Sequence, residues 1–123
     1  MTTNKTKSIA ILNNKPPFAN AIAKEAMDVA LIFGTYEQDT HLFFQGDGVY
    51  QLISGQNPSG IEIKDFLKTF SAFEFYDLNH IYVCEQSLIE RKLTASFHID
   101  NVKVLDKKAF SLALHQHQII FNF

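Results

Sequence analysis

Five short apolar runs, separated by segments with helical periodicity, are the feature that most restricts the fold of this 123-residue chain. The runs are SIAIL at Ser8 to Leu12, THLFFQ at Thr40 to Gln45, HIYVC at His80 to Cys84, VKVL at Val102 to Leu105, and the terminal QIIFNF. Each run has the length of a buried strand and is too short for a helix. Strands that alternate with helices form crossover units, which make the strands parallel and cover both faces with helices. The pattern therefore predicts an α/β protein, a three-layer α/β/α domain with a mostly parallel sheet of about five strands.

Two of the intervening segments have strong helical signatures. From Ala19 to Phe33 the apolar residues recur at a spacing of three or four, and Gly34 follows where a helix C-cap is expected. Ser59 and Glu62 have the spacing of a capping box, and apolar residues then mark one face of a helix that runs to about Tyr76.

The other connections are shorter. Gly46-Asp47-Gly48 is typical of a tight turn. A short helix is predicted from Gln86 to Lys92, after the third strand. Asp106 is suited to cap a last helix that ends near His115.

Composition indicates one globular domain over residues 1–123, since 46% of the residues are hydrophobic and 20% are charged. Residues 1–7 are expected to be disordered. A single cysteine cannot form an internal disulfide, which is typical of a reducing compartment. No stretch approaches the roughly 20 apolar residues of a membrane span, and MTTNKTKS contains no apolar signal core. The net charge of −2 comes without a basic patch. We therefore expect a cytoplasmic protein that binds neither membranes nor nucleic acid directly.

The sequence contains no recognisable signature of a cofactor or metal site. Its only closely spaced glycine pair lacks the third glycine of a dinucleotide fingerprint and the Lys-Ser/Thr of a P-loop, and no Gly-x-Ser-x-Gly elbow occurs. His115 and His117 are two residues apart, but no cysteine pair or third ligand accompanies them, and His41, His80 and His98 are scattered along the chain. We predict no cofactor and no metal, with His115 and His117 at the surface or at a helix end.

Cys84 is the candidate for chemistry. It lies where a predicted strand opens into a predicted helix, and helix N–H groups at such a junction can favour a thiolate. The competing interpretation is a buried residue that behaves as a small hydrophobe. A helix terminus contributes about 0.3–1 kcal/mol, and the carboxylates of Glu85 and Glu90 oppose it. Arg91 could compensate only if the fold turns it back toward the sulfur, so strong activation is not expected.

Several motifs together resemble a known family. They are FFQGDGVYQLISGQNP (Phe43 to Pro58), DFLKTF (Asp65 to Phe70), FYDLNHIYVCEQSLIERKL (Phe75 to Leu93) and the terminal IIFNF. The chain is similar, from about Ser8 to Phe123, to the TusC subunits of the bacterial sulfur-relay system, within the DsrE/DsrF-like superfamily.

This resemblance implies a role in the 2-thiolation of wobble uridine in tRNA, with persulfide sulfur passed along small proteins. It implies assembly with TusB-like and TusD-like paralogues into a dimer of heterotrimers, a TusA-like donor and a TusE-like acceptor. Cys84 matches the position of the sulfur-accepting cysteine of the TusD-like paralogue. In TusC-like subunits the relay is not generally assigned to this thiol, so the resemblance implies an auxiliary thiol rather than the main sulfur carrier.

The sequence departs from the family pattern in two places. The first loop and helix contain two prolines and Lys24-Glu25 where the family is glycine-rich with an Arg-Glu pair. Arg91-Lys92 stands in place of the usual Arg-Gly after the cysteine helix, so the expected glycine cap is missing.

Three functions remain open at this point. The first is an assembly subunit, which the 12 phenylalanines favour because interface cores are rich in aromatic residues. The second is a thiol sulfurtransferase that carries persulfide on Cys84. The third, a small-molecule or nucleotide-binding module, rests on fold analogy alone.

Overall fold

The structure, a computed structural model, describes residues 8–16, 22–36, 38–53, 72, 78 and 80–123. Its sheet has five strands in the order β4-β3-β2-β1-β5, and every adjacent pair is parallel. The strands are β1 Ser8–Asn13, β2 Asp39–Phe44, β3 Ile81–Cys84, β4 Val102–Leu105 and β5 Ile119–Asn122. The predicted α/β class and strand number are confirmed, and the sheet is parallel throughout.

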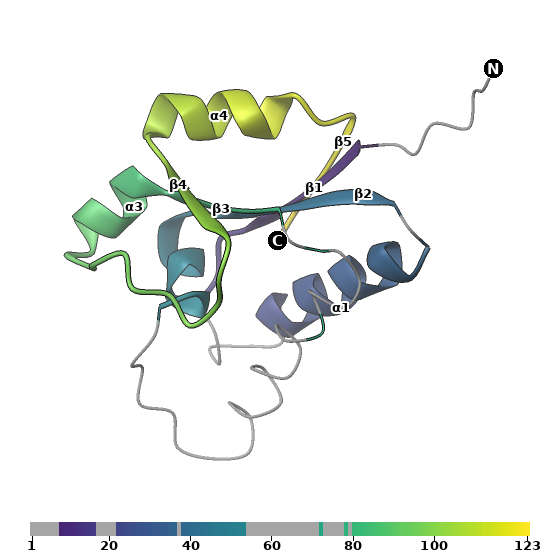
Figure 1. The fold of residues 1–123 in the computed structure, drawn as a ribbon, viewed down its shortest axis with the longest axis horizontal. Coiled ribbons are helices and arrows are strands. Elements are labelled where there is room, and N and C mark those ends of the chain that lie inside the picture. The colour runs from purple at the N-terminus through teal and green to yellow at the C-terminus, as the bar shows by residue number, and fades with distance from the viewer. Residues whose placement is uncertain (1–7, 17–21, 37, 54–71, 73–77, 79) are drawn as a thin grey trace, which may run out of the picture.

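Helices cover both faces of this sheet (Figure 1). Helix α1, Ile22–Thr35, lies on one face, and α4, Lys107–His115, crosses the other. Two short helices leave the carboxyl ends of neighbouring strands: η1, a 3-10 helix at Gly46–Gln51, follows β2, and α3, Glu85–Glu90, follows β3. The helix predicted from Ser59 to Tyr76 lies outside the described residues.

Alternating side chains of the strands build two apolar cores. On the α1 face, side chains of the inner strands pack against Ala26, Met27 and Ala30 of that helix. On the α4 face, a smaller cluster packs against Phe110 and Leu114; its strand members are Ala10, Leu12, Phe43 and Cys84. Because the inner strands are covered on both sides, they are apolar almost continuously, which explains why they were recognisable as short apolar runs.

The helix ends follow local capping chemistry, with one correction. Asp106 caps α4 as predicted, since its Oδ1 accepts a hydrogen bond from the Ala109 N–H at 2.8 Å. Gly34, predicted to be a C-cap, instead lies buried inside the last turn of α1, which continues to Thr35. The Thr35 hydroxyl donates to the Leu31 carbonyl at 2.9 Å and so occupies one of the acceptors at this end.

Helix α3 ends in the geometry that a glycine would normally adopt. Lys92 has a φ of 54°, in the left-handed region. Its N–H donates to the Ile89 carbonyl at 3.0 Å, and the Leu93 N–H donates to the Leu88 carbonyl at 2.9 Å. These two bonds form a Schellman motif with Lys92 at the position that favours glycine. The motif therefore forms without a glycine, but Lys92 has to adopt a strained backbone conformation.

We expect Lys92→Gly to stabilise the protein by about 0.5–1 kcal/mol, because a residue with a Cβ in the left-handed region costs roughly 1–2 kcal/mol and the added freedom of the unfolded glycine offsets part of the gain. The free energy of unfolding in urea measures this change. Lys92→Ala is the matched control, since it removes the charge but keeps the Cβ. An equal gain in both variants would contradict the strain and point to the lysine charge.

Candidate functional site

Cys84 lies at the junction that the sequence predicts. It is the last residue of β3 and the N-cap of α3, with extended backbone angles of φ −79° and ψ 116°. Its strand neighbour in register is Leu105 of β4. Cys84 thus reaches the carboxyl edge of the sheet, where ligand sites of open parallel sheets are commonly found.

The thiol is nevertheless covered in the folded chain. Cys84 is only 6% exposed and belongs to the apolar cluster under α4, with Phe43 beside it in the sheet and Phe110 and Leu114 from the helix. In this environment Cys84 fills space as a small apolar residue, which is the common role of an unpaired cysteine. A sulfur donor of protein size cannot reach Cys84 unless the cover formed by α4 opens.

The charged neighbours of Cys84 are engaged elsewhere. Arg91 Nε donates to Asp47 Oδ1 at 3.1 Å, and its Nη1 donates to the Ser87 carbonyl at 3.2 Å and lies 3.6 Å from a Glu90 carboxylate oxygen. Two carboxylates therefore offset the guanidinium charge. Glu85, in the first turn of α3, is exposed and acidic. Since α3 has only six residues, its dipole adds little, and the expectation of weak activation stays a prediction.

The glycine-containing segment Gly46–Gly48 contacts both the end of β1 and helix α3. Gly46 has a φ of 56°, and its N–H donates to Ser87 Oγ at 2.9 Å, which joins this segment to α3. A Cβ placed on Gly48 would lie 2.1 Å from the Asn13 carbonyl oxygen, so only glycine fits there. These contacts give Gly46 and Gly48 a structural role; the residues predicted as a tight turn form the first part of the 3-10 helix η1.

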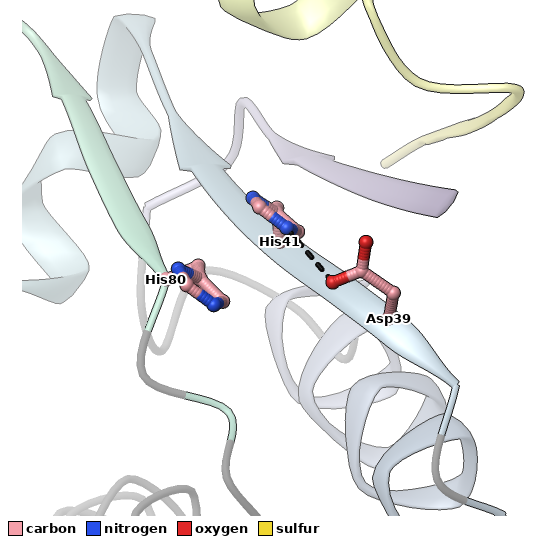
Figure 2. Close-up of side chains that lie close together, drawn as sticks. All are labelled: Asp39, His41 and His80. Atoms are coloured by element: carbon pink, nitrogen blue, oxygen red, sulfur yellow. Dashed lines mark hydrogen bonds and ion pairs between the residues drawn. The ribbon is translucent and has the colours of Figure 1, made fainter. Parts of the chain in front are cut away.

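A second cluster of side chains, which sequence reasoning missed, lies at the amino end of the sheet. His41 of β2 stacks on His80, directly before β3, with ring centroids 4.3 Å apart and planes 8° apart. The His41 Nε2 lies 3.0 Å from Asp39 Oδ1, and these three side chains converge in Figure 2. His117 is also close, with its ring 4.4 Å from that of His41. His41 and His80 are far apart in the sequence, and the pairing of β2 with β3 brings them together.

His115 and His117, which the sequence placed at the surface or at a helix end, have hydrogen-bond partners outside this cluster. His115, at the end of α4, is exposed and hydrogen-bonds to the Ser111 carbonyl at 2.8 Å. His117 precedes β5 and hydrogen-bonds through Nδ1 to Ser8 Oγ. The two residues thus occupy a helix end and a turn, as the sequence suggested, but only His117 contacts the cluster.

Burial lowers the pKa of two of these neighbouring rings, His41 and His117. The pKa of His41 is lowered mainly by desolvation and secondly by His80, against an opposing hydrogen bond and charge from Asp39. Desolvation also lowers the pKa of His117, with His41 as the next cause. Neutral imidazole is the form that accepts a hydrogen bond or a metal ion.

Comparison with known proteins identifies the group to which this fold belongs. Residues 7–123 match the model of the DsrE/DsrF-like family. The chain belongs to the DsrE/DsrF-like family. Among its family relatives, a TusC homologue of Vibrio vulnificus is 36% identical over 87% of this chain and 91% of its own length. The TusC protein of Klebsiella pneumoniae is 30% identical over 95% of this chain and 99% of its own.

Other relatives extend the comparison. The intracellular sulfur oxidation protein DsrF of Allochromatium vinosum is 34% identical over 95% of this chain and 96% of its own length. The crystal structure of the YchN protein of E. coli superposes with a TM-score of 0.76 at 20% identity, and it covers 96% of this chain and all of that one. YchN supports the fold alone, whereas the TusC proteins confirm the resemblance seen in the sequence motifs. None of the helices in the described ranges has both the length and the apolar character of a membrane span.

We expect Cys84 of this DsrE/DsrF-like chain to react with a thiol reagent much more slowly in the native state than in denaturant, because its reaction requires the cover formed by α4 to open. Colorimetric titration with a disulfide reagent, with and without urea, measures both rates. A native rate equal to the denatured rate would show that the thiol is open to solvent and would contradict the burial.

Proposed function

We propose that the chain is an assembly subunit of a cytoplasmic sulfur-relay complex that supports 2-thiolation of wobble uridine in tRNA. In this role it binds TusB-like and TusD-like paralogues in a dimer of heterotrimers, which receives sulfur from a TusA-like donor and passes it to a TusE-like acceptor. The observation that carries this proposal is 30–36% identity to TusC proteins over most of the chain.

The buried thiol supports a subunit that does not itself carry the sulfur. A persulfide carrier exchanges sulfur with donor and acceptor proteins, and its thiolate must be accessible to both. Cys84 is 6% exposed and belongs to one apolar cluster with Phe110 and Leu114. The guanidinium of Arg91, at the end of α3, is already paired with Asp47 and Glu90. We assign Cys84 an auxiliary role and place the main carrier thiol in a paralogous subunit.

The exposed apolar side chains support binding to partners. Both edge strands carry such residues: Val104 on β4 is 38% exposed, and Ile120 and Phe121 on β5 are 39% and 37% exposed. Ile89 on α3 and Leu112 on α4 are more exposed still, at 60% and 59%. Apolar surface on an edge strand or on a short helix is stabilised when another chain covers it.

Most of the phenylalanines in the described residues do not contribute exposed surface for a partner. Phe43, Phe44 and Phe110 are buried in the two cores, and Phe121 is the one exposed phenylalanine of the described part of the chain. Phe66, Phe70 and three others lie outside it. Among the described residues, the exposed apolar side chains of β4, β5, α3 and α4 are therefore mainly aliphatic.

A second function, sulfur transfer through Cys84, is favoured by one observation, the position of this residue at the carboxyl edge between β3 and α3. A further alternative is a related complex that handles sulfur in an oxidative process, because the similar protein DsrF is named for sulfur oxidation. Both alternatives retain a sulfur-handling assembly and differ in the thiol used or in the final acceptor.

We expect co-expression with the TusB-like and TusD-like paralogues of the same genome to give one defined complex on a sizing column. Leu112→Asp and Ile89→Asp place a charge on equally exposed apolar sites of α4 and α3, and at least one should abolish the complex. Ser111→Asp, on an exposed polar site next to Leu112, is the matched control and should leave assembly intact.

Two results would contradict the proposal. One is a genome without such paralogues. The other is a chain that elutes as a monomer in the presence of both paralogues while tRNA thiolation is unchanged in a deletion strain.

A further inference from the structure

The three residues Asp39, His41 and His80 are brought together by strand register at the end of the sheet opposite to Cys84. Leu42 of β2 is paired with Ile81 of β3, so the residue before each of them, His41 and His80, become neighbours. Asp39 lies two residues before His41 and therefore on the same face of β2. Figure 2 shows all three side chains converging over the strands.

The distances between their ligand atoms suit a small metal ion. One atom from each side chain can be chosen so that all three lie within 4.8 Å of one another. Ligands that bind Zn²⁺ tetrahedrally at about 2.0–2.1 Å are about 3.3 Å apart. The His41 Nε2 and Asp39 Oδ1 atoms, at 3.0 Å, already have nearly this spacing. The other separations exceed it by at most about 1.5 Å.

The side chain that must move most is free to do so. The stacked rings of His41 and His80 are nearly parallel, so one ring has to rotate before both can direct a nitrogen lone pair at the same ion. His80 is exposed, and rotation about its side-chain bonds costs little at such a site. His41 is held more firmly, with a side chain only 16% exposed.

The second ring nitrogen of His41 already has a partner of the kind that supports a metal ligand. Its Nδ1 lies 3.2 Å from the Tyr82 hydroxyl. In the tautomer with the proton on Nε2, His41 donates a hydrogen bond to Asp39 through Nε2 and accepts one from the Tyr82 hydroxyl through Nδ1. If the proton moves to Nδ1, which then donates to the Tyr82 oxygen, the Nε2 lone pair becomes available to a cation between His41 and Asp39. The neutral ring changes tautomer, with no net change in its protons.

We propose that Asp39, His41 and His80 form a binding site for a divalent transition metal ion of the Zn²⁺ type. Imidazole and carboxylate are ligands that Zn²⁺ accepts, and three protein ligands leave a fourth position for water or another ligand. His117 borders the site but is not part of the three-residue ligand group, and its Nδ1 is hydrogen-bonded to Ser8. The site is separate from the proposed relay function and does not depend on it.

The test is a calorimetric titration of Zn²⁺ into the untagged full-length chain after removal of metal with a chelator. We expect one Zn²⁺ per chain. The variants His80→Gln and Asp39→Asn change two exposed ligands and should weaken binding by more than the roughly 10–100-fold loss typical of changes to supporting residues. Tyr82→Phe, which removes only the supporting hydroxyl, should weaken it by about 10-fold.

A matched control separates this site from nonspecific binding by histidines. His115→Gln removes an exposed histidine outside the ligand group and should leave the affinity unchanged. Absorption bands of Co²⁺ bound in place of Zn²⁺ should disappear in His80→Gln and persist in His115→Gln. Circular dichroism of each variant checks that the fold is retained. No binding by the wild-type chain, or an equal loss in His115→Gln and His80→Gln, would overturn the proposal.

Discussion

The parallel register of β1, β2 and β3 is the constraint on which both clusters of functional interest depend. Because all three strands run the same way, their carboxyl ends meet at one edge and their amino ends at the other. The carboxyl edge combines Cys84 with the Gly46–Gly48 segment and Arg91. The amino edge combines Asp39, His41 and His80. An antiparallel β3 would separate both groups.

Helix α4 gives these two edges different surroundings. Its apolar side chains Phe110 and Leu114 belong to the same apolar core as Cys84 on this face of the sheet. On the same sheet face, His80 and Asp39 at the amino edge remain exposed. The residue that resembles a catalytic thiol is therefore the covered one, while the polar cluster without a sequence motif is accessible. Burial thus distinguishes the two edges: Cys84 is covered, whereas His80 and Asp39 are exposed.

Local patterns predicted the parts of the fold that depend on local chemistry. Apolar runs located all five strands; for the three inner strands the reason is that both faces are covered and need apolar side chains. Asp106 was predictable as a cap because its contact with Ala109 spans three residues. Gly34 was misjudged because a buried glycine can also allow close packing inside a helix, which the sequence pattern does not distinguish from a cap. The burial of Cys84 depends on where α4 packs, and the contact between His41 and His80 depends on the strand order. Both result from contacts between segments that are distant in the sequence, so local patterns could not predict them.

In the proposed role, this chain contributes binding surface to a sulfur-handling assembly while Cys84 stays covered. The most direct measurement is mass spectrometry of Cys84 after the assembled complex has received sulfur from a cysteine desulfurase and its donor protein, together with tRNA thiolation by Cys84→Ala. Alanine is used because it leaves no unpaired polar group in the apolar cluster. We expect no added sulfur on Cys84 and thiolation equal to that of the wild type. A persulfide on Cys84, together with loss of thiolation in Cys84→Ala complexes that still assemble, would contradict the claim.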